Sequence, residues 1–222
     1  TIACGTIISS LISGRILKRY GTGKVTFVSV LMTACALLGF HFAPSIVWLM
    51  VCAVPLGLGA GAVDTGLNDY VAVNYKARHM SWLHCFWGVG ATLGPIIMAQ
   101  FISGDSSSSW RNGYFLIAAI QFALVIILFF TLPLWKKVKV KRNDRLLEEF
   151  DELKDVINEK ETNTKPLQTK GVKWALTTFF FYCGVEATVG LWGSSFLVNI
   201  KGISVATAAG WISFYYAGIT VG

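Results

Sequence analysis

Long apolar stretches alternate with short polar breaks along most of the chain. Several stretches hold about 20 residues, the length that an α-helix needs to cross a hydrocarbon core of about 30 Å. The core of a soluble domain does not repeat this length, so the pattern predicts an all-α, polytopic membrane protein. Seven membrane-spanning segments are expected, over 1–13, 25–43, 46–68, 82–103, 113–135, 174–199 and 204–222.

The first and last of these segments are expected to be incomplete. Thr1 already lies inside an apolar stretch, and Gly222 lies inside another, so we expect a chain truncated at both ends. The composition fits lipid, with 54% hydrophobic and 14% charged residues. All five cysteines fall in apolar segments without C-x-x-C spacing, which favours small hydrophobic side chains over disulfides or metal ligands.

Basic residues are distributed unequally between alternate loops. Seventeen of the nineteen lie in 14–24, 69–81 and 136–173, and the remaining two are Arg111 and Lys201. Because positively charged loops stay on the cytoplasmic side, we expect these three loops in the cytoplasm and the helices in the plasma membrane. The net charge of +7 is then a consequence of topology, and no nucleic-acid partner is expected.

The polar segment 136–173 divides the chain. It opens with a basic run and continues with apolar residues at helical spacing among eight acidic residues, which predicts an amphipathic cytoplasmic helix and a flexible tail. A solvated linker and a regulatory or docking segment both fit this composition. The order of elements indicates an N-terminal bundle over 1–135, the linker over 136–173 and the start of a C-terminal bundle over 174–222.

Two acidic residues, Asp64 and Glu186, fall within the predicted spans, away from their ends. A carboxylate in lipid is costly, so each should face a water-filled cavity, a partner or a proton. Asp64 shares a helical stripe with Asn68 and two glycines, and Glu186 follows Tyr182 by one turn. For Glu186 and Tyr182, contact with a substrate or cation and structural bonding between helices are both open. Residues that either line a pathway or pack at the interface are Trp192, Asn199, Trp211 and Tyr215.

Two glycine-rich motifs resemble those of the major facilitator superfamily. The first cytoplasmic turn, GRILKRYGTGK, is similar to the loop after the family's second helix, and GVGATLGP is similar to its fifth helix. The resemblance implies helices two to eight of two bundles that rock about a site at mid-membrane. The matching residues are Gly14, Arg19, Gly21 and Lys24 in the first motif, and Gly88, Gly90, Gly94 and Pro95 in the second.

Three stretches together resemble the fucose-permease-like branch of this superfamily: GLGAGAVDTGLND, MSWLHCFWGVGATLGP and FYCGVEATVGLWG. In that branch the matching acid of the fourth helix is tied to proton coupling and substrate. The resemblance therefore implies this role for Asp64, with a structural, hydrogen-bonded acid as the alternative. It also implies that His84 faces the cavity, although a packing histidine fits the sequence equally well.

These features predict a secondary active transporter of a small polar solute, a sugar or similar metabolite, coupled to a proton or another cation. The expected partners are the solute, the cation and the lipid bilayer, and we expect a monomer without cofactor or metal. Efflux of a drug or metabolite is the alternative within transporters, and a multi-helix receptor or sensor is the alternative from another class. We expect no enzyme, because His84 and Cys85 are adjacent and point in different directions on a helix.

Overall fold

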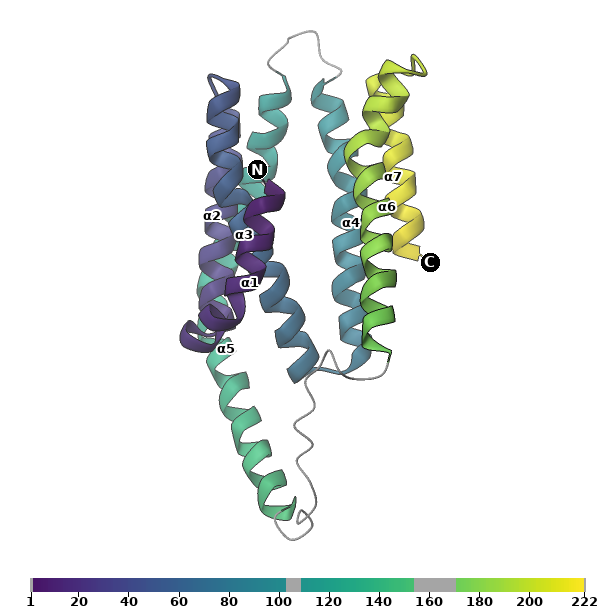
Figure 1. Cartoon of the computed structure of the whole chain (residues 1–222). Helices are drawn as coiled ribbons and strands as arrows, with labels where there is room; N and C mark the ends of the chain where they lie inside the picture. The colour runs from purple at the N-terminus through teal and green to yellow at the C-terminus, as the bar shows by residue number, and fades with distance from the viewer. Residues whose placement is uncertain (1, 103–108, 154–170, 222) are drawn as a thin grey trace.

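The computed structural model describes residues 2–102, 109–153 and 171–221. Within these ranges the chain forms seven α-helices and no β-strand, which confirms the predicted all-α architecture (Figure 1). Five of the described helices are long and apolar enough to cross a membrane, whereas α7 is shorter. The helices are α1 (Ile2–Tyr20), α2 (Thr22–His41), α3 (Ile46–Asn74), α4 (Ala77–Ile102), α5 (Trp110–Leu153), α6 (Val172–Asn199) and α7 (Val205–Val221).

Several helices extend beyond the predicted apolar spans. The first span was expected to end near residue 13, but α1 continues through three basic residues to Tyr20. A helix satisfies its own backbone groups, so it continues into the interface wherever long charged side chains reach water. Only Gly21 separates α1 from α2, and its φ of +81° lies in the left-handed region that favours glycine. The predicted loop 14–24 is therefore mostly helical.

The same extension occurs at the other two basic segments. Between α3 and α4 only Tyr75 and Lys76 are not helical, so most of the predicted loop 69–81 belongs to helices. The helix predicted within 136–173 is a direct continuation of α5, which runs unbroken to Leu153. The predicted flexible tail falls largely on residues 154–170, which lie outside the described residues.

One group of helices consists of α1, α2, α3 and α5, with α3 packed against both α1 and α2 (Figure 1). The backbone carbonyl of Ile2 occupies the place that a β-carbon on Gly57 would take. Ser9 of α1 also donates a hydrogen bond of 2.6 Å to the carbonyl of Leu58. Such close approach is how helices associate in lipid, where apolar burial gives no driving force between them.

The contact between α2 and α5 attaches α5 to this group of helices. The hydroxyl of Thr33 donates to the side-chain oxygen of Gln121 at 3.0 Å in the middle of the two helices. Near their ends, Arg111 donates to the carbonyl of Ala43 at 2.7 Å, and His41 bonds the carbonyl of Arg111 at 3.0 Å. These polar contacts fix the loop between α2 and α3 against the start of α5.

The second group consists of α4, α6 and α7, and its largest interface joins α4 to α7. The side chain of Thr220 in α7 lies against Gly88 of α4, where no β-carbon is in the way. In Figure 1 these three helices stand beside the first group, joined to it by the short turn at Tyr75 and Lys76. Thus α4 packs more with α7 than with the helices that precede it. The division into bundles over 1–135 and 174–222, with a linker over 136–173, stays a prediction.

The connections between successive helices lie alternately at the two ends of the molecule. The turn at Gly21, the turn at Tyr75 and Lys76, and the start of α6 lie at one end in Figure 1. The connections from α2 to α3 and from α6 to α7 lie at the opposite end. The helices thus alternate in direction as the predicted topology requires, and the side that faces the cytoplasm stays a prediction.

Candidate functional site

Asp64 lies on α3 and is paired with Asn68 of the same helix. The Asn68 amide donates to the Asp64 carboxylate at 3.0 Å and to its backbone carbonyl at 2.9 Å. Asp64 itself is exposed and Asn68 is half-buried. The pair was expected to share a stripe with Gly57 and Gly61, but both glycines are buried against α1. Of the four residues in this stripe, only Asp64 and Asn68 are therefore accessible.

Glu186 of α6 lies among phenol side chains from two helices. It is half-buried, and its carboxyl interacts electrostatically with Tyr182, one turn earlier, and with Tyr216 of α7. The hydroxyl of Tyr216 lies directly against Gly190, which follows Glu186 by one turn. Tyr215 lies beside Tyr216, with ring centroids 5.4 Å apart. The structure thus brings together three of the predicted residues, Glu186, Tyr182 and Tyr215. With Tyr216 they form what we call the Glu186 cluster.

Sequence reasoning missed Tyr216, which has the closest link to the neighbouring helices. Its ring meets Trp87 of α4 edge-on, with centroids 6.2 Å apart and planes at 78°. A signal was present in the spacing, because Tyr216 continues a stripe of every fourth residue on α7 that contains the buried Ala208 and Ile212 and ends at Thr220. A residue in such a stripe faces neighbouring helices and not lipid.

The other predicted pathway residues are more scattered. His84 is exposed on α4, one turn before Gly88. Trp192 and Trp211 are also exposed, at 67% and 51%, and neither has a ring contact with the Glu186 cluster in the part of the chain that the structure describes. Asn199 ends α6 and lines a pocket of about 350 Å³ between α4, α6 and α7, together with Pro95 of the glycine-rich motif.

The two predicted motifs differ in what their residues contact. In the second motif Gly88 is a contact point between helices, whereas a β-carbon on Gly90 or Gly94 would meet nothing within 4 Å in the described structure. In the first motif Gly21 supplies the turn between α1 and α2. Arg19 lies over the ring of Tyr20, and Lys24 is exposed, as Gly14 is.

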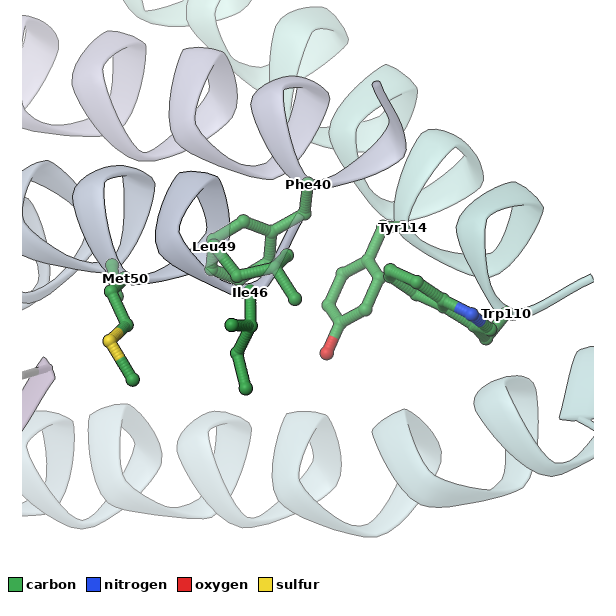
Figure 2. Close-up of a pocket in the computed structure, with 7 residues that line it drawn as sticks. Phe40, Ile46, Leu49, Met50, Trp110 and Tyr114 are labelled. Atoms are coloured by element: carbon green, nitrogen blue, oxygen red, sulfur yellow. The ribbon is translucent and has the colours of Figure 1, made fainter. Parts of the chain in front are cut away.

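A second pocket, of about 440 Å³, opens at the end of the first group that is opposite Gly21. Figure 2 shows its lining from three helices, with the Tyr114 hydroxyl pointing into the space beside Trp110. The lining is apolar and aromatic, and it includes none of the predicted site residues. The lining residues are Phe40, Ile46, Leu49, Met50, Ala53, Trp110 and Tyr114.

The two predicted acids lie in separate polar sites. Asp64 lies on α3 and Glu186 on α6. Among the described residues no group of three His, Cys, Asp or Glu side chains is arranged to hold a metal ion. The two polar sites thus consist of a carboxylate with an amide on α3, and a carboxylate with phenols between α6 and α7. Each site thus combines a carboxylate with side chains that can donate hydrogen bonds.

Comparison with known proteins gives relatives along the whole chain. The sequence is 24% identical to Bypass of stop codon protein 6 of Saccharomyces cerevisiae over 99% of this chain and 46% of that protein. It is 22% identical to the glucose/mannose transporter GlcP of Bacillus subtilis over 98% of this chain and 52% of that protein. A shorter match, 28% identical, covers 41% of the chain and 16% of the efflux pump DEP3 of Alternaria brassicicola.

The chain spans about half the length of the curated relatives that it matches from end to end. No solved structure gives a significant match. The family model of the Major Facilitator Superfamily matches residues 1–222, which is the whole chain. With the apolar helices and the motifs at 14–24 and 88–95, this match shows that the chain belongs to the major facilitator superfamily.

Proposed function

We propose that the full-length protein containing this chain is a secondary active transporter that moves a small polar solute by alternating access. The observation that carries this proposal is the Glu186 cluster, in which a half-buried carboxyl inside an apolar helix interacts with phenols from α6 and α7. A carboxyl inside a membrane-spanning helix is energetically costly, so it is usually found where it binds a ligand, a cation or a partner side chain. In a transporter family the ligand is the solute or the coupling cation.

A sugar or similar metabolite is the solute class that fits this cluster best. Tyr182, Tyr215 and Tyr216 supply aromatic faces together with hydroxyls, and Glu186 supplies a strong acceptor for solute hydroxyls. A sugar ring with several hydroxyls is bound by aromatic faces that pack against the ring and by polar groups that bond its hydroxyls. The name of the GlcP relative, a glucose/mannose transporter, supports this choice, as do the motifs that resemble the fucose-permease-like branch.

Cation coupling is proposed for both membrane acids. Neutralisation by a proton or another cation removes most of the cost of a carboxylate in a low-dielectric setting, so binding and release can accompany the change of access. Asp64 is the leading coupling group because its carboxylate is exposed and already fixed by Asn68. Glu186 is then the leading solute contact. His84, Trp192, Asn199 and Trp211 are proposed to line the pathway.

The remaining features of the transporter are part of the same proposal. The chain supplies most of an N-terminal bundle over 1–135, a cytoplasmic linker over 136–173 and the start of a C-terminal bundle over 174–222. The basic ends of the helices face the cytoplasm, and the protein works as a monomer in the plasma membrane. The solute crosses unchanged, because transport needs no chemical step and no cofactor.

Efflux of a drug-like compound is the second candidate. The match to the efflux pump DEP3 favours it, although that match covers less than half of the chain. The apolar, aromatic pocket shown in Figure 2 also suits a less polar compound than the Glu186 cluster does. The two candidates differ in direction and in solute polarity.

Uptake into proteoliposomes distinguishes the two candidates. The full-length protein is reconstituted and given a panel of labelled hexoses, polyols and drug-like cations, with and without an inward pH gradient. We expect accumulation of a hexose or polyol that depends on the gradient and is lost in Glu186→Gln. Asp69→Asn, at the polar end of α3, is the matched control and should transport normally. Transport confined to drug-like compounds would favour efflux, and transport of nothing in the panel would refute the proposal.

A further inference from the structure

The pocket of about 350 Å³ between α4, α6 and α7 has three polar side chains on one wall. They are Ser194, Ser195 and Asn199, close to the end at which α6 connects to α7 (Figure 1). The rest of the lining is apolar, and no charged side chain lines the pocket among the described residues. Small-molecule sites of about 300–1,000 Å³ commonly combine apolar walls with a few polar groups in this way.

The polar groups on this wall have no partner within the protein. Other hydroxyls of these helices, such as those of Thr188 and Ser213, donate to the carbonyl one turn earlier, at 2.7 and 3.0 Å. The side chains of Ser194, Ser195 and Asn199 make no hydrogen bond within the described part of the chain. A polar group without a partner costs free energy away from water, so this wall favours a polar occupant over a lipid acyl chain.

The pocket lies on the same helices as the Glu186 cluster but at another level of the membrane. Ser194 follows Glu186 by eight residues, or about 12 Å along the helix axis. Between the two levels, the side chain of Ile212 in α7 lies against Gly193 of α6, where a β-carbon would overlap it. On α7, Ile212 likewise stands between the pocket residue Ala209 and the phenols of the cluster. The pocket is therefore a site apart from the Glu186 cluster.

We propose that this pocket is a second binding site for the transported solute, and that it takes a neutral molecule with several hydroxyls. The inference rests on the proposed function for the class of solute, but not on any role of Glu186. The two serine hydroxyls and the asparagine amide bond the hydroxyls of the solute, and the apolar walls from α4 and α7 pack against its carbon skeleton. A charged solute is disfavoured, because it would lose hydration and find no opposite charge in the lining.

The test is protection of a single thiol in the full-length protein, which needs no transport. Ser195→Cys in a cysteine-free background is purified in detergent and alkylated with N-ethylmaleimide, in the presence of glucose, mannose or mannitol. At least one of these neutral probes should slow alkylation by about fivefold when it occupies most of the sites. Charged glucosamine and glucuronate, and cyclohexanol with its single hydroxyl, should leave the rate within about twofold. Phe196→Cys, the next residue and outside the lining, should show no protection.

Further substitutions in the Ser195→Cys protein test the polar wall. Asn199→Ala should raise the probe concentration for half protection by about fivefold, the loss expected for one hydrogen bond between neutral groups. Thr177→Ala is the matched control, because its hydroxyl already donates to the Lys173 carbonyl near the other end of α6, and it should stay within about twofold. Glu186→Gln should keep the protection even where it abolishes uptake, so failure of this site and failure of the proposed function are distinguishable.

Four results would overturn the inference. One is the absence of protection by every neutral probe, and another is equal protection by the charged probes or by cyclohexanol. Equal protection of Phe196→Cys would show that the probes act from outside the pocket. Loss of protection in Glu186→Gln would show that the pocket is no separate site but part of the Glu186 cluster.

Discussion

The amide of Asn68 fixes the carboxylate of Asp64 from within the same helix, at 3.0 Å between donor and acceptor. The two residues are one turn apart, and the same amide nitrogen also bonds the backbone carbonyl of Asp64 at 2.9 Å. The carboxylate is therefore oriented without help from a neighbouring helix. This fixed orientation underlies the predictions for the coupling role that we propose for Asp64.

The first prediction concerns the charge of this carboxylate. Asp64→Asn keeps the shape of the side chain and removes the charge, so the full-length variant should fold, reach normal expression and lose accumulation driven by a cation gradient. Exchange of unlabelled for labelled solute should persist. A well-folded Asp64→Asn protein that accumulates solute as the parent does would exclude Asp64 from coupling.

The second prediction concerns the amide that orients it. Asn68→Ala removes a hydrogen bond worth about 1 kcal/mol, so the dependence of uptake on cation concentration should shift by about fivefold. Asn74→Ala is the matched control, because Asn74 also donates to a carbonyl one turn earlier, that of Tyr70, but lies at the end of α3. Uptake kinetics across a range of cation concentrations measure the difference. Equal effects of the two substitutions would indicate a role in helix stability alone.

The third prediction tests the close contact between α1 and α3. A β-carbon on Gly57 would overlap the backbone of Ile2, which cannot move aside as a side chain can. Gly57→Ala should therefore destabilise the protein by about 1–3 kcal/mol and lower the thermal unfolding midpoint in detergent. Gly14→Ala, on α1, meets nothing within 4 Å in the described structure and should leave the midpoint unchanged. Equal midpoints for both variants would mean that the two helices do not pack this closely.

The fourth prediction concerns Arg111, which joins the loop between α2 and α3 to α5. Its guanidinium donates to the Ala43 carbonyl at 2.7 Å, so Arg111→Ala should cost about 1.5–3 kcal/mol of stability. Lys201→Ala is the control, because this exposed lysine contacts only the ring of Phe196 among the interactions described, and its loss should cost less than about 1 kcal/mol. Thermal unfolding of both variants compares the two. A larger effect at Lys201 would contradict the structural role of Arg111.

The fifth prediction concerns sidedness. Ser45 precedes α3 at one end of the molecule, and Lys76 lies at the other. In a cysteine-free background, Ser45→Cys should react with an impermeant thiol reagent added outside cells, and Lys76→Cys should react only after permeabilisation. Reaction of both from the same side would refute the topology.

The helices were predictable from the sequence because lipid imposes a simple requirement. Each span must satisfy its own backbone groups, so apolar length and helix coincide. The ends were less predictable, as α1 and α3 show, because a helix continues past the apolar stretch for as long as its side chains reach water. The continuation of α5 to Leu153 has the same origin.

The site was predictable only in part. An acid in an apolar segment is rare enough to stand out, which is why Asp64 and Glu186 were found. Tyr216 was missed because a tyrosine in a membrane helix is common, so its place in the stripe with Ala208 and Ile212 was a weak signal, to which the structure adds the packing against Gly190 and Trp87. Which glycines face α1 depended on the crossing of two helices, and a single helix does not contain that information.

The turn at Tyr75 and Lys76 limits how the two helix groups can move. Because two residues offer few backbone torsions, a change of angle between α3 and α4 is concentrated there. Tyr75 has ring contacts on both sides, with Tyr70 of α3 and His79 of α4, so α3 and α4 are joined by side chains as well as by the chain at this end. Near the other end of α4, the side chain of Met98 lies against Gly113 of α5, so any change of angle at Lys76 would have to break this contact.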